Sequence, residues 1–216
     1  MSRRTALAAI SPVASEQWGM ITAGQARRLG VSRQDLNRLV DDGTLAIADQ
    51  ATRVYRLTGA PEYPDLDPLR AAWLQLGGAQ SWHERTTAPN LVISHRSAAH
   101  LRGLGDLIPH EHEFYATTRL RPRRNDIKLR VRSQLAPDSW EIWGGLPVHT
   151  VPAIITDLLS DGEDESAVAQ VVRDALTLGL LRSEKLNAIV EPYTVAYGYP
   201  DPDKFAQALT GNGTRR

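Results

Sequence analysis

Side chains suited to reading DNA bases are concentrated in residues 33–38 of this 216-residue sequence. Leu36, Leu39 and Val40 are spaced by three and four positions, so a helix would place them together on one buried face. The opposite face would then carry guanidinium and carboxamide groups, which form paired hydrogen bonds with base edges in the major groove. The residues of this polar face are Arg33, Gln34, Asn37 and Arg38.

Local signals place this polar face on the second helix of a helix-turn-helix. A first helix, Thr22–Leu29, is expected to end at Gly30, because glycine readily adopts the left-handed conformation that follows helix ends. The second helix begins at Ser32, which forms a capping-box pattern with Asp35, and it ends at Gly43. The short spacing between the helices predicts a tight turn.

A β-hairpin is predicted to follow the two helices. Leu45–Ala48 and Val54–Leu57 favour strand conformation and enclose a polar loop that includes Gln50, with Arg53 beside it. The order helix, turn, helix and hairpin is that of a winged helix-turn-helix, whose hairpin reaches the DNA backbone or minor groove. Two alternatives fit the same residues: a winged helix that binds protein, and a small helical module with an ordinary polar face.

The composition excludes several kinds of chemistry. The chain has no cysteine, so disulfides, thiolate catalysis and cysteine-based zinc sites are ruled out, and a cytoplasmic location is expected. No apolar run approaches the roughly 20 residues of a membrane span. The apolar N-terminal stretch is short and is interrupted by Ser11 and Pro12, which argues against a targeting peptide. We expect a leading helix that turns Leu7 and Ile10 towards the winged helix.

The balanced net charge hides an uneven distribution along the chain. Residues 1–60 contain eight basic and five acidic side chains, and residues 61–135 contain eleven and eight. Residues 136–216 contain six basic and twelve acidic side chains. The positive front suits a polyanion, and the negative back suits a basic partner or simply solubility.

A mixed α/β domain is predicted after a linker. Gly59–Pro68 contains three prolines, which disfavour helix, so we expect the domain boundary between residues 60 and 61. Ser81–Asn90 is polar and poorly patterned, which predicts a loop. The fold class is therefore α+β, with a winged helix-turn-helix in residues 1–60 and a small sheet with several C-terminal helices in residues 61–216. Helices are expected over Asp67–Gly77, His95–Leu101, Pro152–Leu159, Ser166–Leu178 and Asp203–Leu209, with another from Ser183, and strands over Leu91–Ile93, Glu113–Thr117, Ile127–Arg132, Trp140–Trp143 and Leu146–Val151.

A second basic segment, residues 119–132, holds six arginines and one lysine. Its strand alternates Ile127, Leu129 and Val131 with basic residues, which predicts a half-buried strand with a basic outer face. One interpretation extends a DNA footprint to this segment, where each neutralised phosphate contributes a salt slope of about −0.9. The other is a solvated hairpin. The accessory phosphate contacts in the first interpretation are Arg119, Arg121, Arg123 and Arg124.

Catalytic and metal-binding patterns are weak. His95 and His100 lie five positions apart on a predicted helix and point in different directions, while His110 and His112 share a strand face without a third ligand. We therefore expect no metal or other cofactor and interpret these histidines as surface or capping residues. The sequence holds no GxSxG, P-loop or GxGxxG motif, so no enzymatic activity is expected, with an undetected hydrolase or nuclease as a minor alternative.

Three stretches of the chain, in this order, resemble the AbiEi family of bacterial antitoxins. The first is ITAGQARRLGVSRQDLNRLVDDGTL with VYRL, within residues 21–57, and the second is ISHRSAAHLRGL, residues 93–104. The third, WGGLPVHTVPAIITDLLSDGEDESAVAQVVRDAL, spans residues 143–176. The resemblance covers residues 21–209 and depends on the order of the motifs.

The resemblance implies a winged helix that represses its own operator, usually at inverted repeats, and a second part that neutralises a cognate nucleotidyltransferase-like toxin. It assigns operator reading to the polar face of residues 33–38. Asp49 in the wing loop departs from the more basic loop expected in such a protein, because a carboxylate repels phosphate. The acidic connector Asp161–Glu165 is interpreted as a solvated turn or a toxin contact. The further DNA-binding residues in this interpretation are Arg27, Arg28, Ser32 and Arg53.

Overall fold

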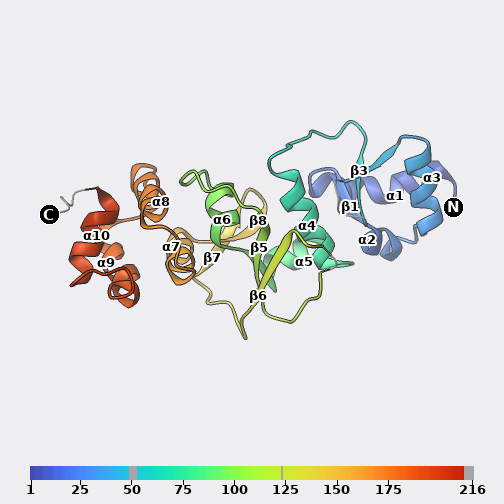
Figure 1. The fold of residues 1–216 in the computed structure, drawn as a ribbon. Coiled ribbons are helices and arrows are strands. Elements are labelled where there is room, and N and C mark those ends of the chain that lie inside the picture. The colour runs from blue at the N-terminus through green and yellow to red at the C-terminus, as the bar shows by residue number, and fades with distance from the viewer. Residues whose placement is uncertain (49–52, 123, 212–216) are drawn as a thin grey trace. The chain divides into compact units, whose positions relative to one another are not determined.

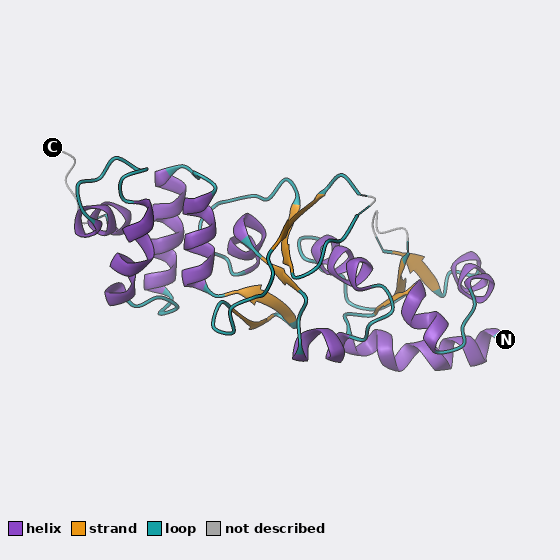
Figure 2. Cartoon of the chain, turned by 90° about the horizontal axis from the view of Figure 1, so that it is seen from below, coloured by secondary structure: helices purple, strands orange, loops and turns teal. Residues whose placement is uncertain are grey.

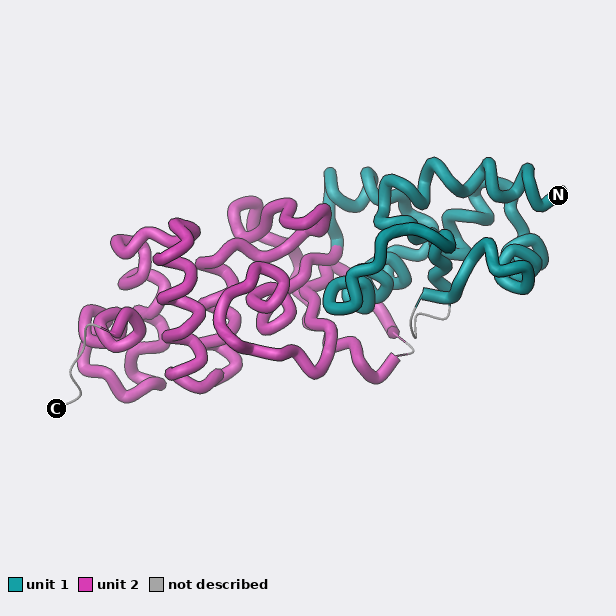
Figure 3. The backbone as a smooth tube through the Cα atoms, turned by 90° about the horizontal axis from the view of Figure 1, so that it is seen from above, with its two compact units in different colours: residues 1–90 teal, residues 91–216 magenta. Residues whose placement is uncertain are grey.

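The computed structural model describes all residues except 49–52, 123 and 212–216, and it has the predicted α+β fold (Figure 1). The chain forms two compact units, residues 1–90 and 91–216 (Figure 3). The first unit therefore extends well beyond the boundary expected after residue 60. Within the described residues, no helix is long and apolar enough to cross a membrane.

The first unit begins with the predicted winged helix-turn-helix. Its elements are α1 (Arg3–Glu16), β1 (Met20–Thr22), α2 (Ala23–Arg28), α3 (Arg33–Asp41), β2 (Leu45–Ile47) and β3 (Val54–Leu57). α2 and α3 are joined by a turn at Gly30, whose φ of +78° is the left-handed conformation expected there. The strands form an antiparallel sheet in the order β1-β3-β2, with Leu45 opposite Leu57 and Met20 opposite Arg56.

One strand of the winged helix, β1, is not predicted from the sequence. Its three residues are all buried and show no alternation, so they carry no local strand signal. Its partner β3 follows both helices in the sequence, and only the folded chain brings the two together. The leading helix α1 forms as predicted, with Ile10 fully buried and Leu7 packed against the same core.

Two helices after the linker complete the first unit. They are α4 (Asp67–Gly77) and α5 (Trp82–Thr87). α4 has proline in its first turn, as expected, whereas α5 occupies the stretch predicted to be a loop, so that prediction is wrong. α5 forms because Ser81 and Glu84 make a capping box and because Arg85 is anchored in the interior. The Arg85 Nη1 donates to the backbone carbonyl oxygen of the buried Trp73 at 2.6 Å.

A mixed five-stranded sheet forms the centre of the second unit. Its strands are β4 (Leu91–Ile93), β5 (His112–Ala116), β6 (Ile127–Val131), β7 (Trp140–Trp143) and β8 (Leu146–His149). Their order is β6-β5-β4-β8-β7, with β4 parallel to β8, β5 parallel to β6 and the other pairs antiparallel. β8 ends two residues before the expected position, because Thr150 is already the N-cap residue of the next helix.

Helices cover the sheet and continue to the end of the described chain (Figure 2). They are α6 (His95–Leu101), α7 (Val151–Ser160), α8 (Glu165–Thr177), α9 (Leu186–Val190) and α10 (Pro202–Thr210), with short 3₁₀ turns η1 (Ser183–Lys185) and η2 (Glu191–Tyr193). α6 contacts β5 and β8, and α7 contacts α6 and β8. α8 and α9 pack on α7, and α10 packs on both of them. Fully buried Ile154, Val171 and Phe205 join these helices into one core.

Candidate nucleic-acid interface

A capping box fixes the start of α3, as the sequence predicts. The Ser32 hydroxyl accepts a hydrogen bond from the Asp35 amide at 3.1 Å, and the Asp35 carboxylate accepts one from the Ser32 amide at 3.2 Å. The Ser32 hydroxyl also donates to this carboxylate, which lowers the pKa of Asp35 from its usual value. The ionised carboxylate lies at the N-terminus of α3, where the helix dipole favours an anion.

α3 has one buried and one exposed face. Leu36 and Leu39 are each 1% exposed, and they belong to the same core cluster as Val31 and Ile10 of α1. The opposite face is open to solvent and carries the side chains that were predicted to read bases. These exposed residues are Arg33, Gln34, Asn37 and Arg38.

The exposed face of α3 is only lightly engaged with the rest of the protein. The Arg38 guanidinium group lies 3.6 Å from the Asp35 carboxylate, and 51% of the arginine side chain is exposed. The side chains of Arg33, Gln34 and Asn37 form no hydrogen bond or ion pair with any residue that the structure describes. Their donors and acceptors are therefore available to another molecule.

An arginine from α1 partly neutralises the acidic C-terminal end of α3. The Arg3 Nε lies 2.7 Å from the Asp42 carboxylate, and 65% of the Arg3 side chain remains exposed. The pKa of Asp42 is lowered by the hydrogen bond from the Thr44 hydroxyl and, to a smaller extent, by Arg3. Sequence analysis does not identify Arg3, because only the tertiary structure brings α1 into contact with α3.

The two arginines at the end of α2 differ in their surroundings. Arg27 is exposed and forms no ion pair within the described part of the chain. Arg28 donates to the carbonyl oxygen of Ala79 at 2.9 Å and to the two carboxylate oxygens of Glu84 at 3.1 and 3.4 Å. Hydrogen bonds from Ser81 and from Arg28 lower the pKa of Glu84 to about 2. Arg28 thus links α2 to α5, which leaves Arg27 as the freer cation.

The wing is described only at its base. Arg53 immediately precedes β3 and is exposed, and its backbone carbonyl accepts a hydrogen bond from the Ala23 amide at 2.9 Å. This places Arg53 where the hairpin loop joins the sheet, as expected for a wing residue. Gln50 and Asp49 lie outside the described residues.

The second basic segment belongs to the second unit. Arg119 and Arg121 are exposed, whereas Arg123 lies outside the described residues. The Arg124 side chain is 8% exposed, and its Nε donates to the Asp126 carboxylate at 2.8 Å. Its guanidinium group is therefore already paired and largely covered, which leaves Arg119 and Arg121 as the exposed members of this set.

β6 is a half-buried strand with its basic side chains on one face, as predicted, and on this face Lys128 and Arg130 are ion-paired with carboxylates. Arg130 lies 3.3 Å from the Glu113 carboxylate and also pairs with Asp161 after α7. Lys128 lies 3.6 Å from Glu113 and 3.8 Å from Asp161. The alternation along the strand is correct, but the fold places β5 and the end of α7 opposite its basic residues. For the same reason, Asp161 in the acidic connector is ion-paired rather than simply solvated.

His95 is buried, contrary to the expectation of a surface or capping residue. Its side chain is 1% exposed, and its Nδ1 lies 2.9 Å from the Ser94 hydroxyl. Ser94 consequently makes no side-chain cap on α6. His100 and His110 are exposed, as expected. Among the described residues, no group of three or more acidic or histidine side chains is arranged to hold a metal ion.

The helix pair, the open polar face of α3 and the adjoining three-stranded sheet place the first unit in the winged helix-turn-helix class. Residues 9–46, from α1 to β2, match the sequence model of a family described as "Transcriptional regulator, AbiEi antitoxin". This match confirms the predicted resemblance within residues 9–46, where the chain is similar to the AbiEi antitoxin regulators.

The fold is similar to that of a solved structure, "Crystal structure of RV2827C protein from Mycobacterium tuberculosis". The TM-score is 0.53 and the sequence identity 15%, with 98% of this chain and 83% of that chain covered. At this identity the similarity establishes the fold alone. No curated protein matches the chain in sequence.

Proposed function

We propose that this protein is an antitoxin that binds its own operator DNA, represses transcription and neutralises a cognate nucleotidyltransferase-like toxin. DNA binding is supported mainly by the polar face of α3. This face is exposed, and its side chains form few contacts with the residues that the structure describes. The family match over residues 9–46 supports a regulatory and antitoxin function. The proposal places the protein in the cytoplasm and assigns it no enzymatic activity and no cofactor.

In the proposed complex, α3 enters the major groove at inverted repeats in the operator. Arg33 and Asn37 lie four positions apart on the exposed face, so both point into the groove. Arginine pairs with the O6 and N7 atoms of guanine, and asparagine pairs with adenine, which gives two bidentate contacts. Gln34 and Arg38 flank these contacts, and Ser32 positions the start of the helix through its capping box with Asp35. The proposed phosphate contacts are Arg3, Arg27 and Arg53, with Arg119 and Arg121 as accessory contacts.

The proposal is tested by salt-dependent binding of the full chain to DNA upstream of its gene and to a scrambled duplex. Arg33→Ala and Asn37→Ala should each lose about 1–3 kcal/mol of preference for the operator over a duplex altered at the contacted base. Arg27→Ala should weaken binding to both duplexes alike and reduce the salt slope by about 0.9. Arg182→Ala, an exposed arginine of the second unit, is the matched control and should change neither quantity.

Two outcomes would contradict the DNA-binding half. Unchanged operator preference in both α3 variants would remove this helix from the interface. Absence of DNA binding by the wild-type protein at low salt would favour the alternative, in which the winged helix binds another protein.

The antitoxin half is tested in cells by co-expression with a nucleotidyltransferase-like protein encoded beside this gene. The wild-type chain should restore growth. A variant that combines Arg27→Ala, Arg33→Ala and Asn37→Ala should lose repression but still restore growth when it is expressed from an independent promoter. Absence of growth rescue by the wild-type chain would contradict the antitoxin assignment.

A further inference from the structure

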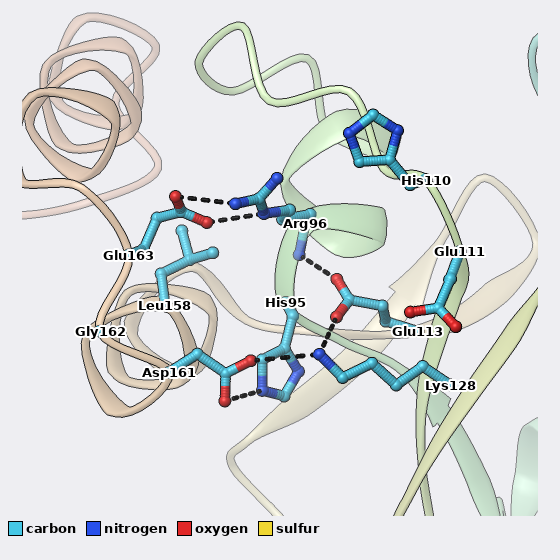
Figure 4. A pocket seen from close by; sticks show the side chains of 10 residues that line it. All are labelled: His95, Arg96, His110, Glu111, Glu113, Lys128, Leu158, Asp161, Gly162 and Glu163. Atoms are coloured by element: carbon cyan, nitrogen blue, oxygen red, sulfur yellow. Dashed lines mark hydrogen bonds and ion pairs between the residues drawn. The ribbon is translucent and has the colours of Figure 1, made fainter.

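A pocket of about 280 Å³ opens in the second unit (Figure 4). Its walls come from α6, β6, β5 with the segment that leads into it, and the C-terminal end of α7 with the connector that follows. Four carboxylates line it, against one arginine and one lysine. Arg130, which also contacts two of these carboxylates, does not restore the balance. The pocket therefore keeps an excess of negative charge. Its carboxylates belong to Glu111, Glu113, Asp161 and Glu163.

The walls of the pocket are held in place by charged hydrogen bonds. Arg96 donates from Nε and Nη2 to the two carboxylate oxygens of Glu163, at 2.6 and 2.9 Å. The backbone amide of Arg96 donates to the Glu113 carboxylate at 2.9 Å. Glu111 differs from these residues, because it is exposed and its carboxylate forms no ion pair within the described part of the chain. Hydrogen bonds from Arg96 thus fix Glu113 and Glu163, whereas the Glu111 carboxylate is available to bind a ligand.

His95 supplies a second, independent sign of a ligand. Its side chain is 1% exposed, lines the pocket, and presents an Nε2 atom with no hydrogen-bond partner among the described residues. Its Nδ1 lies 2.9 Å from the Ser94 hydroxyl, and Nδ1 and Nε2 each lie 3.7 Å from a carboxylate oxygen, of Asp157 and Asp161 respectively. In the tautomer that donates the Nδ1 proton to the Ser94 hydroxyl, Nε2 carries no proton. Nε2 is then an acceptor.

In this tautomer two acceptors lie together beside the buried imidazole, although the Asp161 side chain is 38% exposed and also pairs with Lys128 and Arg130. The His95 Nε2 and the Asp161 Oδ1 are 3.7 Å apart, which is longer than a hydrogen bond (Figure 4). The backbone φ of +52° at His95 is a left-handed conformation that is uncommon for residues other than glycine, and it sets the direction in which the side chain leaves the backbone. A ligand that places an N–H donor between these two atoms would satisfy both.

We propose that this pocket binds the guanidinium group of an arginine presented by a protein partner. Guanidinium has five N–H donors, no acceptor and a permanent positive charge, and its planar shape pairs with carboxylates. Residues 136–216 carry twelve acidic and six basic side chains, so the surrounding field attracts a basic partner. The proposal rests on the proposed function for the identity of that partner as the toxin.

The pocket is tested first with a small probe, by titrating the full chain with N-acetyl-arginine amide and observing the imidazole nitrogens of His95 by NMR. A saturable shift of Nε2 at millimolar concentrations is expected, with no comparable shift from inorganic phosphate. No saturable change up to about 50 mM arginine amide, or a stronger response to phosphate, would overturn the proposal.

Substitutions in the pocket provide the second arm of the test. Glu111→Gln should weaken arginine amide about threefold, because this carboxylate is exposed. Asp161→Asn should weaken it about tenfold, because Asp161 faces the buried imidazole. Glu184→Gln, an exposed acidic residue on η1, is the matched control and should have no effect. Equal losses in the control, or no loss in either pocket variant that melts like the wild type, would contradict the assignment.

The final arm separates this proposal from the proposed function. Glu111→Gln and Asp161→Asn should reduce affinity for the toxin while operator binding by the first unit stays unchanged. Unchanged toxin affinity in both variants, with repression and neutralisation intact, would defeat the pocket proposal alone. If the wild-type chain neither binds DNA nor neutralises the toxin, the proposed function fails. The titration with N-acetyl-arginine amide would still show whether the pocket binds a guanidinium group.

Discussion

At the scale of single residues, His95 shows how burial changes the chemistry of a side chain. Burial lowers the pKa of His95, although the nearby Asp157 and Asp161 carboxylates act in the opposite direction. The neutral form of the imidazole is therefore favoured in the folded protein. A neutral buried histidine makes the stability of the unit that contains it sensitive to acid.

The lowered pKa of His95 predicts that the stability of the second unit falls in mild acid. Because the unfolded chain takes up the proton first, the contribution is complete above the unfolded pKa of about 6.5 and is lost as the pH falls towards the lower folded pKa. His95→Asn, whose side chain tolerates the left-handed backbone, should flatten this dependence. Urea unfolding at a series of pH values between 7 and 5 measures it.

The exposed His110 gives the matched control for this prediction, since His110→Asn should leave the pH dependence of unfolding as it is in the wild type. A His95→Asn protein that loses stability in acid as steeply as the wild type would show that another group is responsible.

At the scale of elements, α3 depends on its first turn. The capping box between Ser32 and Asp35 satisfies two backbone amides that would otherwise lack partners. Ser32→Ala should therefore lower the free energy of unfolding by about 1 kcal/mol, whereas Ser32→Thr, which preserves the cap, should change it little. Denaturant unfolding monitored by circular dichroism measures both. Equal stability of the alanine variant and the wild type would show that the box contributes nothing measurable.

Most helices and strands follow from local sequence, and the exceptions have physical causes. α2, α3 and α4 are marked by caps, a proline and apolar spacing, which act within one or two turns. α5 also has a local mark, the capping box of Ser81 and Glu84, but its apolar spacing is poor and its anchor is Arg85, whose guanidinium group lies 3.5 Å from the centre of the Trp73 ring. An arginine in a sequence predicts a solvent-exposed side chain, and the residues next to Arg85 give no sign that an aromatic ring covers it.

At the scale of the whole molecule, the extent of the first unit is a consequence of packing across the proline-rich linker. Trp73 of α4 is fully buried, with its ring centre 6.4 Å from that of Trp18. Asp67 pairs with the buried Arg56 of β3 and, at 3.2 Å, with Arg70. The linker therefore connects two parts of one unit.

This packing predicts that a fragment of residues 1–90 folds, whereas a fragment of residues 1–60 does not. Removing Trp73 alone from a core costs about 3–5 kcal/mol, and the shorter fragment loses the whole of α4. The longer fragment should unfold cooperatively and bind operator DNA with a salt slope close to that of the full chain. A stable fragment of residues 1–60 with full DNA binding would instead support the domain boundary after residue 60 that the linker predicts.

The amino-acid sequence alone was sufficient for the helix pair and the hairpin of the winged helix, because caps, turns and apolar spacing are properties of neighbouring residues, whereas β1 came only from the folded chain. It was also sufficient for the polar face of α3, since a helical period separates that face from the core. The burial of His95, the pairing of Lys128 and Arg130 with carboxylates and the pocket they surround came only from the tertiary structure. These features depend on which distant segments meet, and hydrophobic contacts elsewhere in the core decide that.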